Sequence, residues 1–437
     1  MIRLLQIILT GILVSFFYFP IEFSFFPGAN TKMMEAVIGL VCLAFYLIRR
    51  RSWDIPIAFL LLIASAIGVS MVALLSVTIN QTPDYTYVSY IVSFSVWLSA
   101  AFAVCCLIKF VHQKITPRLV LNYLVAVCLF QCISSLVIDS NPVISRWVDT
   151  YFFYDQDLAQ RVHRLYGIGS LFDVAGLRFA VVLVAIASYL SNQRKPLQSI
   201  EEYYYLIGFL LISTIGNMMA RTTLVGTGVG IFVILVSFIF NNEQSLITKT
   251  HKGLTWLGLL TVTVIICIIL YNTNLQARGL FRFAFEGFFS LAEKGYWEIS
   301  STEKLKTMVV WPETIHTWMI GDGYFENSRY DINYLGDATD KGFYMGTDVG
   351  YLRFIFYFGV IGLLPMMGVI VGASIICMRQ FREERLLFLL ALVVGLLVWF
   401  KVSTDIFLFL ALFLSVAALQ DMEPSPSTVP APLFENH

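Results

Sequence analysis

The sequence predicts an all-α polytopic membrane protein with about twelve transmembrane helices and a long, partly helical external loop. Three observations predict this class. Hydrophobic residues make up 58% of the chain and charged residues only 13%, roughly half the charged share of a soluble domain. Apolar runs long enough to cross a bilayer recur from one end of the chain to the other. Polar residues gather between these runs, which excludes a soluble domain with a single anchor.

The apolar segments can be taken in chain order. The first, from Leu4 to Phe19, is followed by Pro20 and Glu22 rather than by a small-residue cleavage site. It is therefore interpreted as a retained span and not as a signal peptide. The tightest external turn is expected at Ala220-Arg221-Thr222. The expected spans are residues 4–20, 33–48, 55–79, 88–108, 119–138, 173–190, 203–219, 222–240, 254–271, 350–376, 386–400 and 405–419.

The basic residues of the short connections predict the orientation of the chain in the membrane. Cytoplasmic connections are enriched in Lys and Arg. The connections on one side hold fourteen such residues, whereas the short connections on the other side hold only Lys32, Arg221 and Lys401. Both termini are therefore expected in the cytoplasm. Residues 1–421 form the predicted bundle, with external loops at 139–172 and 272–349, and residues 422–437 form a disordered cytoplasmic tail rich in Pro and Ser.

The second external loop is predicted to have internal structure. Residues 276–294 place aromatic residues on one helical face, and Arg282 and Glu286 stand four apart, which favours a helix lying flat in the membrane interface. Ser300 with Glu303 indicates a capping box that opens a second helix, ended by Pro312. Gly321-Asp322-Gly323 predicts a turn, and a Tyr-rich strip follows. Loops of this length tend to be functional, although a loop that merely covers the bundle fits the same pattern.

Arginines are the chief candidate binding residues of the external side. Their guanidinium groups are permanently charged and bind phosphate oxygens in a bidentate fork, which suits a diphosphate. Arg178, Arg221 and Arg353 lie at or just inside the ends of spans. The alternative is that these side chains snorkel to lipid head groups or pair with Asp139, Asp173 or Asp348. The external arginines are Arg146, Arg161, Arg164, Arg178, Arg221, Arg278, Arg282, Arg329 and Arg353.

Asp348 is the strongest candidate for a catalytic base. It lies at the membrane edge five residues before Arg353, and a carboxylate within hydrogen-bond reach can accept the proton of a sugar hydroxyl. The alternative is that Asp348 caps the helix that begins near Gly350. His163, Glu313, Asp322 and His316 are weaker candidates, and His316 follows Pro312 on a surface-like segment.

Several motifs that suggest other chemistry are set aside. Asp155-Gln156-Asp157 resembles a metal-binding pattern of nucleotide-sugar transferases, but it lies on the external side, where nucleotide sugars are absent. Residues 226–230 alternate Gly with other residues inside a span, where small residues allow close helix packing. The seven cysteines lie in or beside apolar runs, which argues against a disulfide framework or a cysteine metal site. No metal and no cofactor are expected.

Three segments together resemble the O-antigen ligase and polymerase superfamily. The first motif is Arg164-Leu165-Tyr166-Gly167 with Phe172-Asp173 and Ala180, and the second is Arg221-Thr222 at a tight external turn. The third is residues 320–325, followed by residues 347–352 and then Gly359-Val360-Ile361-Gly362. The resemblance covers residues 164–363 in order and on one side of the membrane.

The resemblance implies a multi-pass protein of the bacterial inner membrane that transfers glycans at the periplasmic face. It implies a Wzy-type polymerase that extends O-antigen, capsule or exopolysaccharide from undecaprenyl-pyrophosphate-linked repeat units. The alternatives are a ligase that transfers the glycan to lipid A–core, and a non-enzymatic flippase or transporter. Ligases carry His where this chain has Asp348, which favours the polymerase. The implied partners are the lipid-linked oligosaccharides, the bilayer, a chain-length regulator and a flippase, and not nucleic acid.

The resemblance also implies roles for particular residues. Asp348, singled out by its position at the membrane edge, and Arg221, which lies in the second motif, are the expected catalytic residues. The resemblance implies contacts of Arg164, Arg178 and Arg221 with the pyrophosphate, and Arg353, which lies at the end of a span, is expected to contact it as well. Sugars of the glycan are expected to contact residues of the second external loop, namely His316, Tyr324, Tyr330, Tyr334 and Tyr344.

Overall fold

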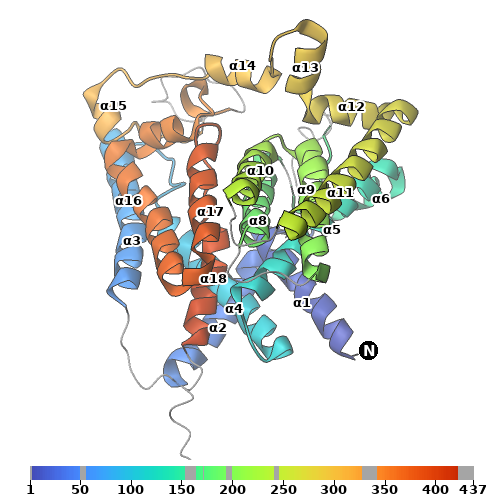
Figure 1. The fold of residues 1–437 in the computed structure, drawn as a ribbon. Coiled ribbons are helices and arrows are strands. Elements are labelled where there is room, and N and C mark those ends of the chain that lie inside the picture. Colours follow the sequence, from blue (N-terminus) through green and yellow to red (C-terminus); the bar gives the residue numbers. More distant parts are fainter. Residues whose placement is uncertain are drawn as a thin grey trace, which may run out of the picture.

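The computed structural model is a helical bundle with a helical loop across one end (Figure 1). It describes residues 2–49, 56–152, 164–170, 172–192, 199–240, 246–326 and 342–421. The predicted Asp155–Asp157 motif, His163, Tyr330, Tyr334 and the tail after residue 421 lie outside these ranges. The elements of the first half are α1 (Ile2–Tyr18), β1 (Glu22–Phe23), β2 (Phe26–Asn30), α2 (Thr31–Arg49), α3 (Ile57–Asn80), α4 (Tyr90–His112), α5 (Pro117–Ser140), α6 (Pro142–Tyr151), α8 (Phe172–Leu190) and α9 (Ser199–Met219).

The second half carries the loop helices between two groups of bundle helices. Its elements are α10 (Thr223–Phe240), α11 (Leu246–Thr273), α12 (Leu275–Ala284), α13 (Glu286–Lys294), α14 (Ser300–Thr307), α15 (Ile315–Met319), η1 (Tyr344–Gly346), α16 (Gly350–Gln380), η2 (Arg382–Glu384), α17 (Arg385–Val398) and α18 (Phe407–Gln420). Each of the twelve segments expected to cross the membrane is helical. The only sheet in the described ranges pairs β1 with β2 antiparallel.

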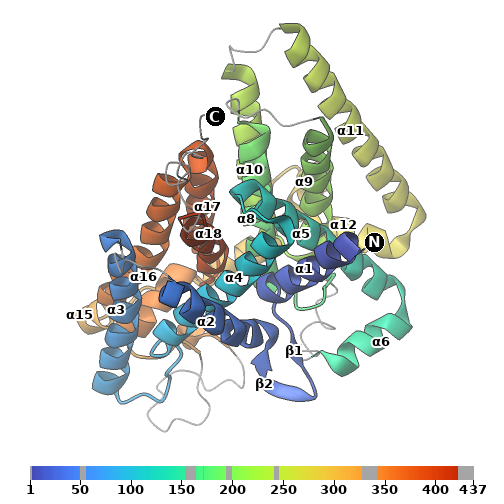
Figure 2. The same ribbon diagram turned by 90° about the horizontal axis from the view of Figure 1, so that it is seen from below.

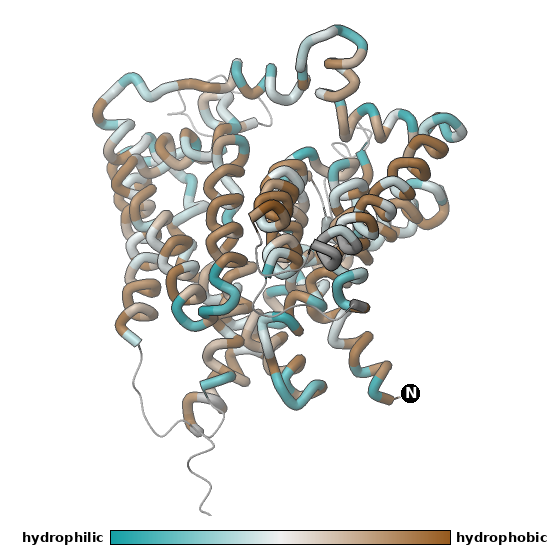
Figure 3. The backbone as a smooth tube through the Cα atoms, in the orientation of Figure 1, coloured by the Kyte–Doolittle hydropathy of each residue, from teal (hydrophilic) through white to brown (hydrophobic). Residues whose placement is uncertain are grey.

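The composition of the helices fits a membrane protein. Seven described helices are long and apolar enough to cross a bilayer, namely α3, α4, α5, α8, α10, α16 and the part of α11 from Gly253 to Thr273. The apolar helices α1 and α18 are shorter. Apolar residues cover the bundle helices, and hydrophilic residues gather at the two ends (Figure 3). The membrane class is thereby supported, and the count of twelve spans stays a prediction.

Helices α8 and α18 form the centre of the bundle. Almost every residue of α8 from Ala175 to Tyr189 is buried, whereas α11 lies at the edge of the bundle and exposes apolar side chains (Figure 2). Close packing relies on small residues. A Cβ at Gly226 of α10 would lie 2.3 Å from the Cα of Ala180 in α8, so only glycine fits there. Gly230 packs in the same way against Phe209 of α9, whereas Gly228 is exposed, so two of the three glycines of residues 226–230 serve close packing.

The long helix α16 is broken at Gly359, and the break holds the turn at Gly321. Gly359 has φ of 66°, a backbone conformation that side-chain-bearing residues rarely adopt. The break frees carbonyl groups of α16, and the N–H groups of Asp322 and Gly323 donate to the carbonyls of Phe356 and Tyr357 at 2.6 and 3.2 Å. The chain bends at Gly323, and Gly321 and Gly323 both have positive φ, which is consistent with the turn expected there. The two halves of the third sequence motif are thus bonded to each other.

Two details of the loop helices differ from expectation. The predicted helix over residues 276–294 is divided at Phe285, so Arg282 pairs with Glu293 at 2.7 Å rather than with Glu286. The predicted capping box of Ser300 and Glu303 is wrong. Ser300 instead donates its backbone N–H and its hydroxyl to Glu286, and α14 ends at Thr307, well before Pro312. A contact between distant segments has replaced the local one.

Candidate functional site

Helices α12–α15 cover one end of the bundle (Figure 1), and most of the polar residues singled out by the sequence belong to the segments that meet there. The N-terminal ends of α8 and α16, the α9–α10 turn and the α17–α18 connection all reach this end. Each of these is a helix end or a tight connection, where polar side chains can lie beside an apolar bundle without interrupting a span. The charged residues of these connections form three neighbouring groups and line two cavities.

Arg221 fixes the loop helices to the bundle. Its Nη1 lies 2.6 Å from the Oε2 of Glu286, and its Nε donates to the Phe283 carbonyl at 3.0 Å. It also donates to the hydroxyls of Ser300 and Ser301. Burial lowers the pKa of Arg221 while the Glu286 carboxylate acts to raise it, and the group stays charged at neutral pH because its ordinary pKa is so high. Arg221 is therefore held by protein groups that a bound anion would have to replace.

Arg164 and Arg221 share one aromatic ring. The guanidinium carbon of Arg164 lies 4.7 Å from the centroid of Phe283, and that of Arg221 lies 4.2 Å from the same centroid. The Nε of Arg164 is buried and makes no hydrogen bond within the described part of the chain. The first two arginine motifs, 57 residues apart along the chain (221 − 164), thus meet at Phe283, a residue to which the sequence analysis gave no role.

A second charged group joins α8 to the α17–α18 connection. The Nζ of Lys401 lies 2.7 Å from the Oδ1 of Asp173 and 3.0 Å from the hydroxyl of Thr222, which itself donates to Asp173. An arginine was expected as the alternative ion-pair partner of Asp173, but its partner is Lys401. In the sequence, Lys401 was used only to predict the orientation of the chain, and it was not a candidate site residue. The polar run that contains it, residues 401–405 between two apolar helices, is the signal that could have identified it.

These two groups line one cavity, which we call the loop cavity. It has a volume of about 340 Å³, near the lower end of the usual range for small-molecule sites. One wall comes from the bundle and the other from α13 and α14. Its polar lining residues are Arg221, Thr222, Glu286, Ser301, Thr302 and Lys401.

Asp348 lies close enough to Lys401 of the loop cavity to interact with it electrostatically, and it does not cap α16. The residue before α16 is Val349, and no side chain accepts a hydrogen bond from the first turn. The Oδ1 of Asp348 lies 4.0 Å from the Nη1 of Arg353. Burial raises the pKa of Asp348 to about 6, with Arg353 and Lys401 acting to lower it and Asp173 acting to raise it. A carboxyl group with this pKa can exchange a proton near neutral pH.

Arg353 forms the third group and ties three segments together. It is only 7% exposed. Its guanidinium donates to the hydroxyl of Ser403 at 3.0 Å and to the carbonyl of Phe325 at 3.2 Å, and lies 3.7 Å from the Phe325 ring. Arg353 therefore connects α16 to the segment after Gly323 and to the α17–α18 connection, close to Asp348.

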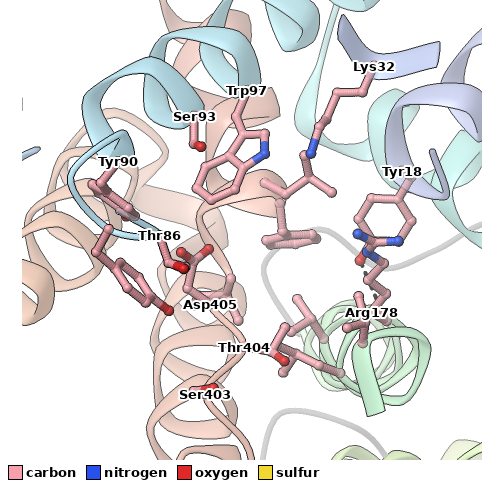
Figure 4. A pocket seen from close by; sticks show the side chains of 17 residues that line it. Tyr18, Lys32, Thr86, Tyr90, Ser93, Trp97, Arg178, Ser403, Thr404 and Asp405 are labelled. Atoms are coloured by element: carbon pink, nitrogen blue, oxygen red, sulfur yellow. Dashed lines mark hydrogen bonds between the residues drawn. The ribbon is translucent and has the colours of Figure 1, made fainter. Parts of the chain in front are cut away.

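Arg178 lies apart from the other arginines. It lines a second cavity, of about 330 Å³, enclosed by α1, α2, α4, α8 and the α17–α18 connection (Figure 4). We call this the bundle cavity, and its lining includes Tyr18, Lys32, Trp97, Arg178 and Asp405. The four arginines expected at the pyrophosphate are thus distributed. Arg164 and Arg221 meet at Phe283, Arg353 contacts Asp348, and Arg178 enters a different cavity.

The described candidates for glycan contacts lie near the turn at Gly321. The rings of Tyr324 and Tyr344 are stacked with centroids 5.2 Å apart. The hydroxyl of Tyr344 donates to Asp322 at 3.2 Å, and burial raises the pKa of Asp322. Tyr324 is almost completely buried and Tyr344 partly so, while His316 is exposed on α15. Tyr344 and His316 therefore have surface that a ligand can reach.

Among the described residues, no group of three or more His, Cys, Asp or Glu side chains is placed to hold a metal ion. No protein-family model, curated protein or solved structure matches the chain.

Proposed function

We propose that the protein is a membrane glycosyltransferase that polymerises undecaprenyl-pyrophosphate-linked oligosaccharide repeat units. The observation that carries the proposal is the placement of Arg221 and Lys401 in one cavity beneath a helical loop, with Arg164 beside Arg221 at Phe283 and the ionisable Asp348 close enough to Lys401 to interact with it electrostatically. Cations suit a diphosphate leaving group, and a carboxylate suits the proton of an attacking hydroxyl. The end of the bundle suits a lipid-linked substrate.

The donor is assigned to the loop cavity. Its diphosphate would lie against Arg221 and Lys401, with Arg164 adding charge from the other side of Phe283. Arg221 now pairs with Glu286, and Lys401 with Asp173. A dianionic diphosphate competes with these single carboxylates because it carries more charge and more acceptor oxygens. Arg353 would position Asp348 rather than bind phosphate, since its guanidinium is already held by Ser403 and Phe325.

The acceptor is assigned to the space between the loop and Asp348. The non-reducing sugar of a second lipid-linked unit would present its hydroxyl there, with Tyr344 and His316 as contacts for the glycan. The hydroxyl oxygen forms a bond to the anomeric carbon of the donor as the bond from that carbon to the diphosphate oxygen breaks. Asp348 takes the hydroxyl proton, and the polyprenyl diphosphate leaves as an anion stabilised by Arg221 and Lys401.

The proposal places the loop cavity at the periplasmic face of the bacterial inner membrane, with a flippase and a chain-length regulator as partners. Two contacts support a cytoplasmic position for the C-terminal end of the bundle. Lys109 donates to the carbonyl of Leu419, and Gln420 donates to the carbonyl of Ile115. The C-terminal end of α18 is thereby fixed beside the basic α4–α5 connection that is predicted to be cytoplasmic.

The proposal can be tested with protein purified in detergent and supplied with lipid-linked repeat units. Formation of a ladder without added core lipid would distinguish a polymerase from a ligase and from a flippase. Arg221→Ala and Asp348→Ala should each leave the protein in the membrane and abolish long chains. Full-length polymer from either variant at normal expression would refute the role given to that residue. Lys306→Gln, which removes an exposed charge of α14, is the matched control.

A further inference from the structure

The bundle cavity contains two cations that the mechanism above does not use. Lys32 enters it from the N-terminal end of α2, and Arg178 enters it from the first half of α8 (Figure 4). Lys32 lies over the ring of Trp97 at 5.1 Å, and Arg178 lies over the ring of Phe19 at 5.5 Å. Neither side chain forms an ion pair or donates a hydrogen bond to any residue in the described part of the chain. This contrasts with Arg221 and Lys401, which are both paired.

The single carboxylate of the bundle cavity does not neutralise these cations. Asp405 lies close enough to Lys32 and Arg178 to interact with both electrostatically. It forms no ion pair with either of them within the described residues. Its Oδ1 instead accepts the N–H of Phe407 at 3.0 Å, at the start of α18. With two basic side chains and one carboxyl group, the cavity has a formal excess of one positive charge within an apolar bundle.

Isolated charge of this kind is costly inside a membrane protein and marks a functional site. The remaining lining groups are the hydroxyls of Tyr, Ser and Thr residues and several apolar side chains. A hydroxyl can donate to an anion but cannot neutralise a cation. An anion with several acceptor oxygens would balance these cations and accept from the hydroxyls around them. A guanidinium that binds in a bidentate fork, set beside an ammonium, is the combination that recognises a phosphate group.

We propose that the bundle cavity is a second anion site, which binds a phosphate or diphosphate ester through Lys32 and Arg178. It is separate from the loop cavity, because the two cavities share no lining residue. The phosphate can be borne by a lipid or be free in solution. The identification of the ligand as the second lipid diphosphate rests on the proposed function, since a polymerase must hold two lipid-linked units at once. The binding of phosphate itself does not rest on it.

Binding can be measured by isothermal titration of detergent-purified protein with inorganic pyrophosphate and, separately, with a polyprenyl diphosphate. The Arg221→Gln background removes the contribution of the loop cavity. In that background, Lys32→Gln and Arg178→Gln should each weaken binding about tenfold, which corresponds to about 1.4 kcal/mol. Asp405→Asn should tighten binding, because it removes the one negative charge that opposes the ligand. Lys32→Arg should retain binding, and Lys306→Gln is the control outside both cavities.

The outcomes separate this inference from the proposed function. Charge-dependent binding of both probes would support a site for the phosphate group, and binding of the polyprenyl diphosphate alone would support a site for a lipid head group. If Lys32→Gln and Arg178→Gln bind both probes as tightly as the background protein, the inference is wrong even where the ladder forms normally. If Lys32-dependent binding persists and no ladder forms, only the proposed function is wrong. Thermal unfolding of each variant identifies a loss of binding that is due to misfolding.

Discussion

The loop cavity and the bundle cavity are similar in size and both contain two cations, but they treat these cations differently. In the loop cavity each cation has a carboxylate partner, Glu286 for Arg221 and Asp173 for Lys401. In the bundle cavity Lys32 and Arg178 have no such partner within the described residues, and Asp405 is bonded to the backbone. The cations of the loop cavity are thus paired with carboxylates of the protein, whereas the cations of the bundle cavity are not paired within the described residues.

The difference indicates what each cavity can do. A ligand of the loop cavity must exchange with carboxylates that also hold the loop helices in place, so binding there is coupled to movement of α13 and α14. A ligand of the bundle cavity finds cations already desolvated and unpaired, so binding requires no exchange. Four predictions follow from this comparison, in order of decreasing effect.

The largest effect is expected at Asp348, the carboxylate that interacts electrostatically with Lys401 of the loop cavity. Asp348→Asn should lower the rate of polymer formation about 10²–10⁴-fold, the usual contribution of a general base. The base must be ionised to accept a proton, and burial raises the pKa of Asp348 to about 6. The rate with the native residue should therefore fall as the pH drops through about 6, and the residual rate of Asp348→Asn should not. Ladder formation from pH 5 to 8 measures both, with the exposed Glu293→Gln as control. A native rate that is flat over this range would contradict the role of Asp348.

The second prediction concerns the paired cation Lys401. Lys401→Met should lower the free energy of unfolding by about 1–3 kcal/mol, because it leaves the Asp173 carboxylate without its partner. The side chains of the pair are 29% and 25% exposed, so solvent screening keeps the loss below that of a fully buried pair. Thermal unfolding in detergent measures it. The double variant Asp173→Asn with Lys401→Met should recover most of the stability, and equal losses in the single and double variants would show that the pair is unimportant.

The third prediction concerns Lys32, where a substitution is expected to raise the free energy of unfolding rather than to lower it. Lys32→Met in the ligand-free protein should raise the free energy of unfolding by about 1 kcal/mol, because it removes an unpaired charge and keeps a side chain of similar length. The same thermal assay measures it beside Lys401→Met. If both substitutions destabilise the protein equally, the distinction between a balanced and an unbalanced cavity fails.

The smallest effect is expected at Glu286. Glu286→Gln should tighten the binding of inorganic pyrophosphate to the loop cavity about fivefold, or about 1 kcal/mol, because Arg221 no longer has to leave a carboxylate. A background that carries both Lys32→Gln and Arg178→Gln weakens binding to the bundle cavity about a hundredfold, and titration calorimetry then measures binding to the loop cavity. Glu293→Gln breaks an exposed pair with Arg282 and should leave the affinity unchanged. Weaker binding by Glu286→Gln would mean that Glu286 positions Arg221 for the ligand.

Much of the helical framework could be predicted from the sequence because it depends on local pattern. Apolar length alone placed most of the helices within a few residues, although α11 begins at Leu246, eight residues before the expected span, and the tight turn at Ala220–Thr222 followed from two adjoining apolar runs. Arg221 and Asp348 could be singled out because charge beside an apolar run is unusual. The predictions for the loop helices were less successful. The pairing of Arg282 with Glu286 and the capping box at Ser300 both assumed that near neighbours in the chain bond to each other.

By itself, the sequence determined a chain of apolar helices with polar ends, since the cost of placing backbone and charge in hydrocarbon depends on composition and length. Only the tertiary structure decided which charges meet. In the tertiary structure Glu286 pairs with Arg221 and Lys401 pairs with Asp173. Arg178 lies in a cavity apart from the other arginines. The physical reason is that an ion pair depends on distance in space, and helix packing brings together residues that lie tens to hundreds of positions apart in the chain.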